Sequence, residues 1–177
     1  MTSFVNTLHA KTIVIATQNE KKRAEIKEIL KDVPGILLKG PDDFPFLPQV
    51  EDDGTTFQEN AIKKAIPLAK ACNTWAMSDD SGLEIDALSG RPGIYSCRYA
   101  GARATDEKNI EKVLSELRGV PRERRTARFV CVIALAGPQG LFFVAEGSCE
   151  GVIAEEPKGK YGFGYDPIFY VPDYHQT

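Results

Sequence analysis

The chain has 177 residues, 42% of them hydrophobic, and a net charge of −3 at pH 7. This length supports one well-buried core, so we expect a single folded domain. The acidic balance argues against a broad nucleic-acid surface, and the longest apolar run, residues 129–136, is far shorter than the roughly 20 residues that cross a bilayer. Neither a nucleic-acid partner nor a membrane partner is therefore expected.

The numbers and positions of cysteine and histidine residues indicate the cellular compartment and limit the kinds of catalytic or metal site. The four cysteines are scattered without a Cys-x-x-Cys pair, so we expect reduced thiols in a cytoplasmic protein, with Cys131 packed in the core. Only two histidines are present, His9 and His175, which argues against a zinc site and against Ser-His-Asp or Cys-His catalysis. Any metal must be held mostly by carboxylates, and this favours Mg²⁺, with Mn²⁺ as the alternative.

The N-terminal part of the chain predicts a strand, a polar turn and a helix. Residues 1–11 have neither the basic start nor the apolar core of a signal peptide, and we expect them to be flexible. The β-branched run Thr12–Ala16 predicts a buried strand. Apolar residues spaced i, i+3, i+4 and i+7 from Ile26 predict one apolar face of a helix.

The polar turn between this strand and helix, Thr17–Lys22, is a candidate phosphate site. A helix N-terminus brings together backbone N–H groups and the positive end of the helix dipole, and Lys22 would add an ammonium. Lysines in a first helical turn oppose the dipole, so a bound anion would explain them. The alternative is an N-capped helix whose Lys21, Lys22 and Arg23 form a solvated face.

Two adjacent aspartates, Asp79 and Asp80, make the next candidate site, and Ser81 and Gly82 follow them directly. The short apolar run Thr74–Met77 precedes the pair, so we expect a strand that ends in a tight polar loop. Adjacent carboxylates repel each other unless a cation or a shared proton relieves the charge, and Mg²⁺ suits this task. The alternative is a solvated turn, because Asp, Ser and Gly dominate turns.

Other segments predict the scaffold. Thr56 and Glu59 fit a capping box at the start of a helix, which Pro67 should kink. A further helix is predicted around residues 110–117, and two strands flanking Gly137–Gly140 predict a hairpin. These patterns indicate an α/β fold with a mixed central sheet flanked by helices.

The segment Gly159–Phe169 alternates glycines with aromatic residues. Glycines let the backbone approach a ligand closely, Phe163 and Tyr165 could stack on a planar base, and Asp166 could accept hydrogen bonds from ring N–H groups. The alternative is a glycine-rich loop whose aromatic side chains belong to the core.

Together these segments resemble the inosine triphosphate pyrophosphatase-like enzymes, which hydrolyse non-standard purine nucleoside triphosphates. The resemblance runs from Thr12 to the end of the chain. It implies a Mg²⁺-dependent hydrolase that converts ITP, dITP or XTP to the nucleoside monophosphate and pyrophosphate. It also implies a cytoplasmic homodimer and two lobes with an intervening nucleotide cleft. The matching pieces are Ala16–Lys22, Thr56–Ala61, Asp79–Leu83, Pro92–Ser96 and Gly162–Pro167.

The resemblance further implies roles for individual residues. Asp80 would hold the metal and activate water, with Asp79 in support and its own part in metal binding open. Glu51 would be the second metal ligand. Because Asp52 and Asp53 lie beside it, the motif leaves open which of these acids takes that role. The residues expected to contact the substrate are Thr17, Gln18, Asn19, Lys22, Ser81, Arg98, Phe163, Gly164, Tyr165 and Asp166.

The family pattern continues to a lysine and a Ser-His-Arg segment that recognises the base, whereas this sequence stops at Thr177. We therefore expect residues 12–177 to form one nucleoside triphosphate pyrophosphatase domain without its C-terminal part, which bears on base selectivity. Two alternatives stay open at this point. One is a related housecleaning pyrophosphatase for other modified nucleotides, and the other is a truncated nucleotide-binding protein without turnover.

Overall fold

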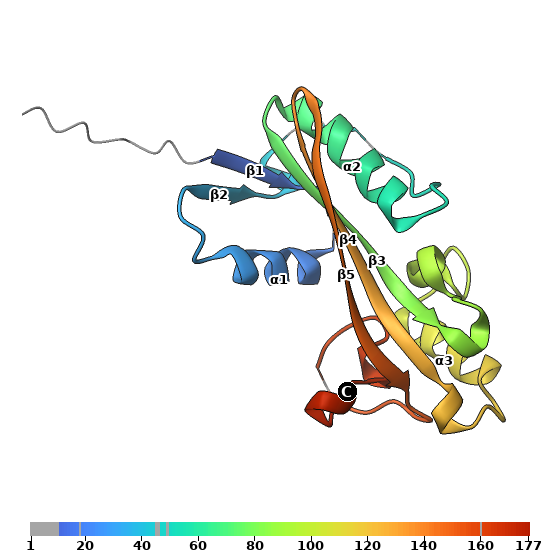
Figure 1. The fold of residues 1–177 in the computed structure, drawn as a ribbon. Coiled ribbons are helices and arrows are strands. Elements are labelled where there is room, and N and C mark those ends of the chain that lie inside the picture. Colours follow the sequence, from blue (N-terminus) through green and yellow to red (C-terminus); the bar gives the residue numbers. More distant parts are fainter. Residues whose placement is uncertain (1–10, 18, 45–46, 49, 160) are drawn as a thin grey trace, which may run out of the picture. The chain divides into compact units, whose positions relative to one another are not determined.

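The computed structural model describes residues 11–17, 19–44, 47–48, 50–159 and 161–177, so the segment of residues 1–11 that we expect to be flexible lies outside them except for Lys11. Within the described residues, six strands form one sheet in the order β2-β1-β3-β4-β5-β6 (Figure 1). The strands are β1 (Lys11–Ile15), β2 (Ile36–Lys39), β3 (Trp75–Ile85), β4 (Thr126–Gly137), β5 (Gly140–Ile153) and β6 (Phe169–Tyr170). The α-helices are α1 (Glu20–Leu30), α2 (Phe57–Cys72) and α3 (Asp106–Glu116).

The sheet is mixed, as the sequence predicts. Strand β1 pairs in parallel with β2 on one side and with β3 on the other, whereas β5 and β6 pair antiparallel. Strands β4 and β5 are joined by Pro138 and Gln139 alone, a connection so short that only a hairpin can make it. The predicted α/β fold and the predicted hairpin are both confirmed.

The chain divides into two compact units. The first comprises Met1–Gly54, Gln58–Asp79 and Ile133–Val144, and the second comprises Thr55–Phe57, Asp80–Val132 and Ala145–Thr177.

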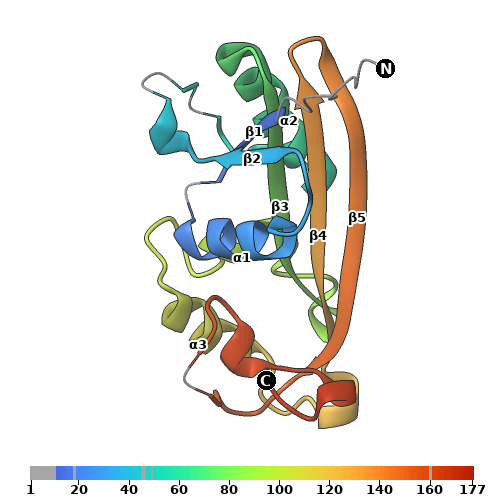
Figure 2. The ribbon, with the colours of Figure 1, turned by 90° about the vertical axis from the view of Figure 1, so that its left-hand side faces the viewer.

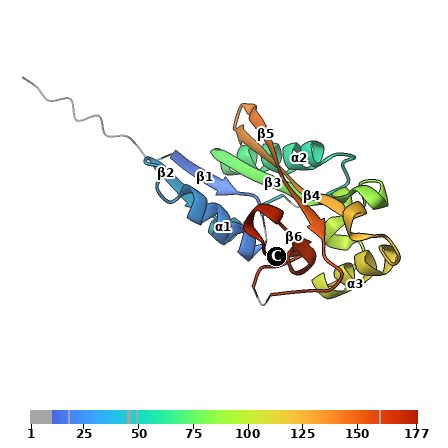
Figure 3. The same ribbon diagram turned by 60° about the horizontal axis from the view of Figure 1, so that its bottom comes forward.

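In the first unit, β1 lies between two parallel neighbours, and the crossover helices α1 and α2 lie on opposite faces of the sheet (Figures 2 and 3). Helix α2 continues through Pro67 rather than ending there. Three alanines of α2, spaced four residues apart, are fully buried and leave room for the helix to pack closely. These are Ala61, Ala65 and Ala69.

In the second unit, apolar side chains from β3, α3 and the C-terminal region share one core. Leu83 and Ile85 of β3 and Val113 of α3 are completely buried there. Thr105 caps α3 by accepting a hydrogen bond from the Lys108 amide at 3.4 Å. The helix predicted around residues 110–117 is therefore confirmed.

Two packing expectations are wrong. Cys131 is exposed, because β4 alternates its side chains between two faces and buries Val130 and Val132 on the other one. Ile29 is 76% exposed, because the half-buried stripe of α1 follows positions four residues apart, Ile26 and Leu30, and passes beside it. No helix among the described residues is long and apolar enough to cross a membrane.

Candidate functional site

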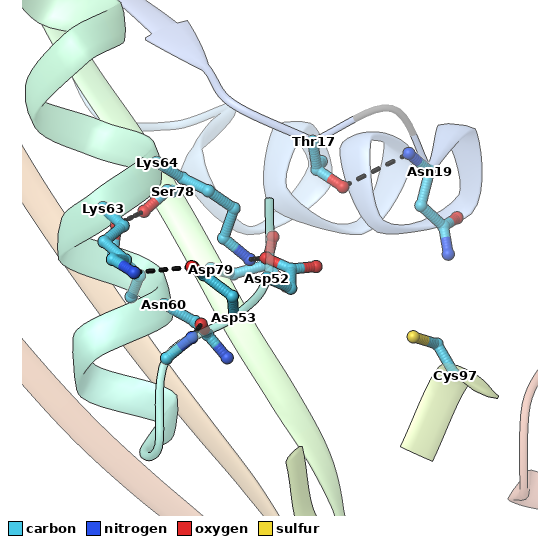
Figure 4. Close-up of polar contacts among 12 residues, drawn as sticks. Thr17, Asn19, Asp52, Asp53, Asn60, Lys63, Lys64, Ser78, Asp79 and Cys97 are labelled. Atoms are coloured by element: carbon cyan, nitrogen blue, oxygen red, sulfur yellow. Dashed lines mark hydrogen bonds and ion pairs between the residues drawn. The ribbon is translucent and has the colours of Figure 1, made fainter. Parts of the chain in front are cut away.

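The turn after β1 has the N-capped geometry that the sequence analysis gave as the alternative to a phosphate site. Asn19 is the N-cap of α1, and its Oδ1 accepts hydrogen bonds from the amides of Lys21 at 3.0 Å and Lys22 at 3.2 Å. The Thr17 hydroxyl oxygen accepts from the Asn19 amide at 3.2 Å (Figure 4). Gln18, which we expect to contact substrate, lies outside the described residues.

This cap changes what the helix N-terminus can offer to an anion. The amides of Lys21 and Lys22 already donate to Asn19, so they are not the groups that would receive a phosphate oxygen. Side-chain donors in the described part of this turn include the Thr17 hydroxyl hydrogen, the Asn19 side-chain NH₂ and the Lys22 ammonium. An anion at this corner would therefore meet side-chain donors as well as backbone.

Lys22 pairs with Asp79, 57 residues away in the chain. The Lys22 Nζ lies 2.6 Å from Asp79 Oδ2, and the Asp79 side chain is only 6% exposed. The second carboxylate oxygen, Oδ1, is buried and has no hydrogen-bond partner among the described residues. A half-satisfied buried carboxylate is costly, so this oxygen marks a place where a cation or a water would be stabilising.

The two aspartates do not end a strand. Strand β3 runs without interruption through Ser78, Asp79, Asp80 and Gly82, so the expected polar loop is wrong. Neighbouring side chains of a strand point to opposite faces. Asp79 and Asp80 are therefore directed apart, and the strong mutual repulsion expected of two side-by-side carboxylates does not arise.

The acidic run before α2 is held by side chains of that helix (Figure 4). Lys64 Nζ lies 3.4 Å from Asp52 Oδ1, and Lys63 Nζ lies 2.5 Å from Asp53 Oδ1. The hydrogen bond from Lys63 holds the pKa of the Asp53 carboxyl below its usual range. Glu51 is exposed, and no ion pair involving it is found within the described part of the chain.

A cavity of about 690 Å³ in the first unit gathers several of these groups. Thr17, Glu51, Asp52 and Lys64 form its polar lining, and the remaining lining is largely apolar. The structure thus brings the predicted phosphate residue Thr17 and the predicted metal acid Glu51 to one cavity. Lys64 is a residue that the sequence analysis missed, although its place one helical turn after Asn60, behind an acidic run, was a usable signal.

The predicted metal ligands, Glu51 and Asp80, are both oxygen donors. Among the described residues, no three His, Cys, Asp or Glu side chains gather into a metal-binding cluster. Mg²⁺ does not require one, because it usually takes one or two carboxylates and completes its shell with waters and substrate phosphates. The predicted ligands Glu51 and Asp80 belong to different units.

In the second unit, Asp80 and Ser81 are half-buried on β3. Gly82, the next residue, lies in close contact with the segment that carries Gly93 and Ser96. A Cβ on Gly82 would lie 2.4 Å from the Gly93 carbonyl oxygen and 2.6 Å from Ser96 Oγ. That hydroxyl accepts from the Leu83 amide at 2.9 Å and donates to the Gly93 carbonyl at 2.6 Å. Glycine at position 82 is thus required by the close approach of the segment carrying Ser96.

The glycine–aromatic segment has two kinds of aromatic residue. Tyr165 is 4% exposed in the core, and its hydroxyl donates to the Ser96 carbonyl at 2.8 Å. Burial raises the pKa of this hydroxyl. The expectation that Tyr165 presents its ring to a base does not fit this burial, and the core alternative does. Phe163 is half-buried, and its amide donates to Asp166 Oδ2 at 2.9 Å.

The predicted substrate residues Gly164 and Arg98 each contact another side chain. The Gly164 amide donates to Asp106 Oδ2 at 2.8 Å, at the start of α3. The Arg98 guanidinium lies 5.3 Å from the Tyr95 ring. Buried Asn109 holds the residues on both sides of Arg98, because it accepts from the Ala100 amide at 2.8 Å and donates to the Cys97 carbonyl at 3.3 Å.

Comparison with known proteins identifies relatives over most of the chain. The chain is 54% identical to a dITP/XTP pyrophosphatase of Desulforamulus reducens over 165 residues, which is 93% of this chain and 82% of that protein. It is 53% identical to the dITP/XTP pyrophosphatase of Bacillus subtilis over 167 residues, which is 94% of this chain and 84% of that protein.

Solved structures and a family model agree with these relatives. A HAM1 protein from Coxiella burnetii superposes with a TM-score of 0.84 at 46% identity, covering 94% of this chain and 85% of that one. The Staphylococcus aureus Ham1 protein gives 0.81 at 47% identity, covering 94% and 84%. The family model described as the Ham1 family matches residues 13–177. The resemblance predicted from the motifs is confirmed, and the chain belongs to the Ham1 family.

Proposed function

We propose that this chain hydrolyses non-standard purine nucleoside triphosphates, dITP, XTP and ITP, to the nucleoside monophosphate and pyrophosphate. The observation that carries the proposal is the match to two dITP/XTP pyrophosphatases, at 54% and 53% identity over nearly the whole chain. Such identity over such a length favours the same activity over the two alternatives, a pyrophosphatase for other nucleotides and a binding protein without turnover.

The corner between β1 and α1 would grip the triphosphate. Lys22 would contribute a positive charge, and Thr17 and Asn19 would contribute neutral donors. The Lys22 ammonium is held by Asp79 at 2.6 Å. A phosphate oxygen would share or replace that contact, so the ammonium is already oriented when substrate arrives.

Mg²⁺ is the proposed cofactor. Glu51 and Asp80 would hold it, and Asp52 lines the same cavity as Glu51. When bound, the ion would neutralise charge on the phosphate oxygens and lower the pKa of a coordinated water. An oxygen-only donor set fits Mg²⁺ or Mn²⁺ rather than a softer metal.

Asp80 would act as the general base that orients and deprotonates the attacking water. It is half-buried on a strand rather than on a mobile loop, so its carboxylate has a defined direction. Positioning and electrostatics supply most of the catalysis in phosphoryl transfer, and no covalent intermediate on the protein is needed.

Base recognition would come from the segment around Phe163. The Phe163 ring is the half-buried aromatic that could stack on a purine, and Gly164, Asp166, Ser81 and Arg98 would add polar contacts. Tyr165 would act from within the core, where its hydroxyl ties this segment to Ser96.

We also propose a cytoplasmic homodimer. The compartment is supported by three exposed cysteines, which suit a reducing environment. Self-association is supported by large exposed apolar side chains of β5, Phe142 at 67% and Phe143 at 44%, because such surface is usually covered by a partner.

The direct test is pyrophosphate release from dITP, XTP, ITP, ATP and GTP, with and without Mg²⁺. The proposal expects release from the first three and dependence on the metal. Equal rates for ATP and dITP would refute the proposed substrate class, and no release from any nucleotide would refute the proposed activity.

A further inference from the structure

One face of α2 holds three consecutive residues of the segment that precedes it. Lys64 pairs with Asp52, Lys63 pairs with Asp53, and Asn60 accepts a hydrogen bond from the Gly54 amide. Positions 60, 63 and 64 are spaced i, i+3 and i+4, so they share one side of the helix. We call residues 51–54 the acid loop.

Asn60 is the buried member of this set. Its side chain is 1% exposed, whereas the Lys63 side chain is 46% exposed and belongs to a surface pair. The Asn60 Oδ1 lies 2.7 Å from the Gly54 nitrogen (Figure 4). An exposed ion pair such as that of Lys63 and Asp53 contributes little to structure, so the loop is held mainly by the hydrogen bond of Asn60 and by the less exposed pair of Lys64 and Asp52.

The side chain of Asn60 occupies the space where a Cβ of residue 54 would lie. A Cβ at position 54 would lie 2.5 Å from Asn60 Oδ1 and 3.0 Å from Glu59 Cβ, which no ordinary packing allows. The loop backbone therefore lies directly on the side chain of Asn60 because residue 54 has no side chain. The pair sets where the chain leaves the helix and hence where Glu51 and Asp52 reach the cavity.

We propose that Asn60 is a positioning residue that orders the acid loop for cation binding. The inference rests on the proposed function, because it assigns the cation site in part to Glu51. Asn60 would act through Gly54 rather than by contact with metal or substrate. Its neutral amide is suited to the task, since an aspartate at this position would add a buried negative charge beside Asp52 and Asp53.

The test combines three variants of the full chain: Asn60→Ala, Gly54→Ala and the double variant. Calorimetry without nucleotide measures the Mg²⁺ affinity of each variant. Hydrogen exchange measures the opening of the Gly54 amide, and urea unfolding measures the stability of the fold. We expect Asn60→Ala to weaken Mg²⁺ binding about tenfold, the value of one hydrogen bond, and to speed Gly54 exchange. Gly54→Ala should act similarly from the loop side, and it keeps the test available if the Asn60 variant folds poorly.

The double variant distinguishes loss of the specific contact between Asn60 and Gly54 from a general loss of stability. With the Asn60 side chain removed, the main clash of a methyl group at position 54 disappears, so the two effects should combine less than additively. A matched control is Asn109→Ala, because Asn109 is 3% exposed and also accepts from a backbone amide, that of Ala100 at 2.8 Å. The control should lose comparable stability and keep wild-type Mg²⁺ affinity.

Three results would overturn the inference. The first is unchanged Mg²⁺ affinity in Asn60→Ala, whether or not Gly54 exchange increases. The second is equal loss of affinity in the Asn109→Ala control, and the third is strict additivity in the double variant. Failure of the wild type to release pyrophosphate from dITP would instead refute the proposed function, while the binding and exchange data would still decide the role of Asn60.

Discussion

Replacing Lys22 by methionine tests whether the Lys22–Asp79 pair serves substrate or only the fold. Methionine keeps the length of the stem and removes the ammonium, so Asp79 Oδ2 loses its partner at 2.6 Å. Asp79 Oδ1 has no hydrogen-bond partner within the described residues, and the side chain is 6% exposed. The substitution therefore leaves a buried carboxylate without a counter-charge.

The expected cost follows from this burial. Breaking a fully buried pair costs about 3–5 kcal/mol, but Lys22 is 26% exposed, so we expect about 2 kcal/mol, within the range for a charged hydrogen bond. Urea unfolding at pH 7 measures this loss. The double variant Lys22→Met/Asp79→Asn removes the unpaired charge and should recover most of the stability.

Nucleotide binding distinguishes a role of Lys22 in holding substrate from a role in stabilising the fold. Calorimetry with dITP in the presence of EDTA should show affinity lower by about 10- to 100-fold in Lys22→Met and a smaller loss for dIMP. The double variant should stay weak, because its ammonium is still missing. A matched control is Lys31→Met, just after the same helix, whose exposed pair with Glu28 should contribute little. Unchanged dITP affinity in Lys22→Met, or recovered affinity in the double variant, would show that Lys22 serves Asp79 alone.

Three further predictions concern the second unit. Asp80→Asn should lower turnover of dITP by at least about 10²-fold, the usual scale for losing a general base, with the fold retained; near-normal turnover would exclude the proposed role. Tyr165→Phe should cost about 1 kcal/mol in urea unfolding through the lost bond to Ser96, and a null effect would contradict that bond. The hydrogen bond from Thr126, together with Arg128, lowers the pKa of Asp86 below its usual value. Its stabilisation is therefore present above about pH 4 and is lost as pH falls through the folded pKa. Asp86→Asn should accordingly lose less stability than wild type as the pH is lowered from about 5 to about 2, and parallel curves would refute this.

Local patterns in the sequence correctly predicted the local structure. The β-branched run before Thr17 and the apolar spacing of α3 each depend on neighbours within a few residues. The hairpin between β4 and β5 depends on its turn residues in the same way. The motif at Asp79 and Asp80 was recognised as important, but its conformation was mistaken, because Asp and Gly favour turns locally and the pairing of β3 in the sheet overrides that preference.

By itself, the sequence determined the α/β class, the family and the chemical nature of the candidate site. Only the tertiary structure decided that Asp79 holds Lys22, that Tyr165 is core, and that Asn60 lies against Gly54. Secondary structure and motif chemistry follow from residues close in sequence, whereas these contacts depend on which side of a strand or helix faces a distant segment. A shift of one residue in strand register would reverse that choice, and no local pattern encodes it.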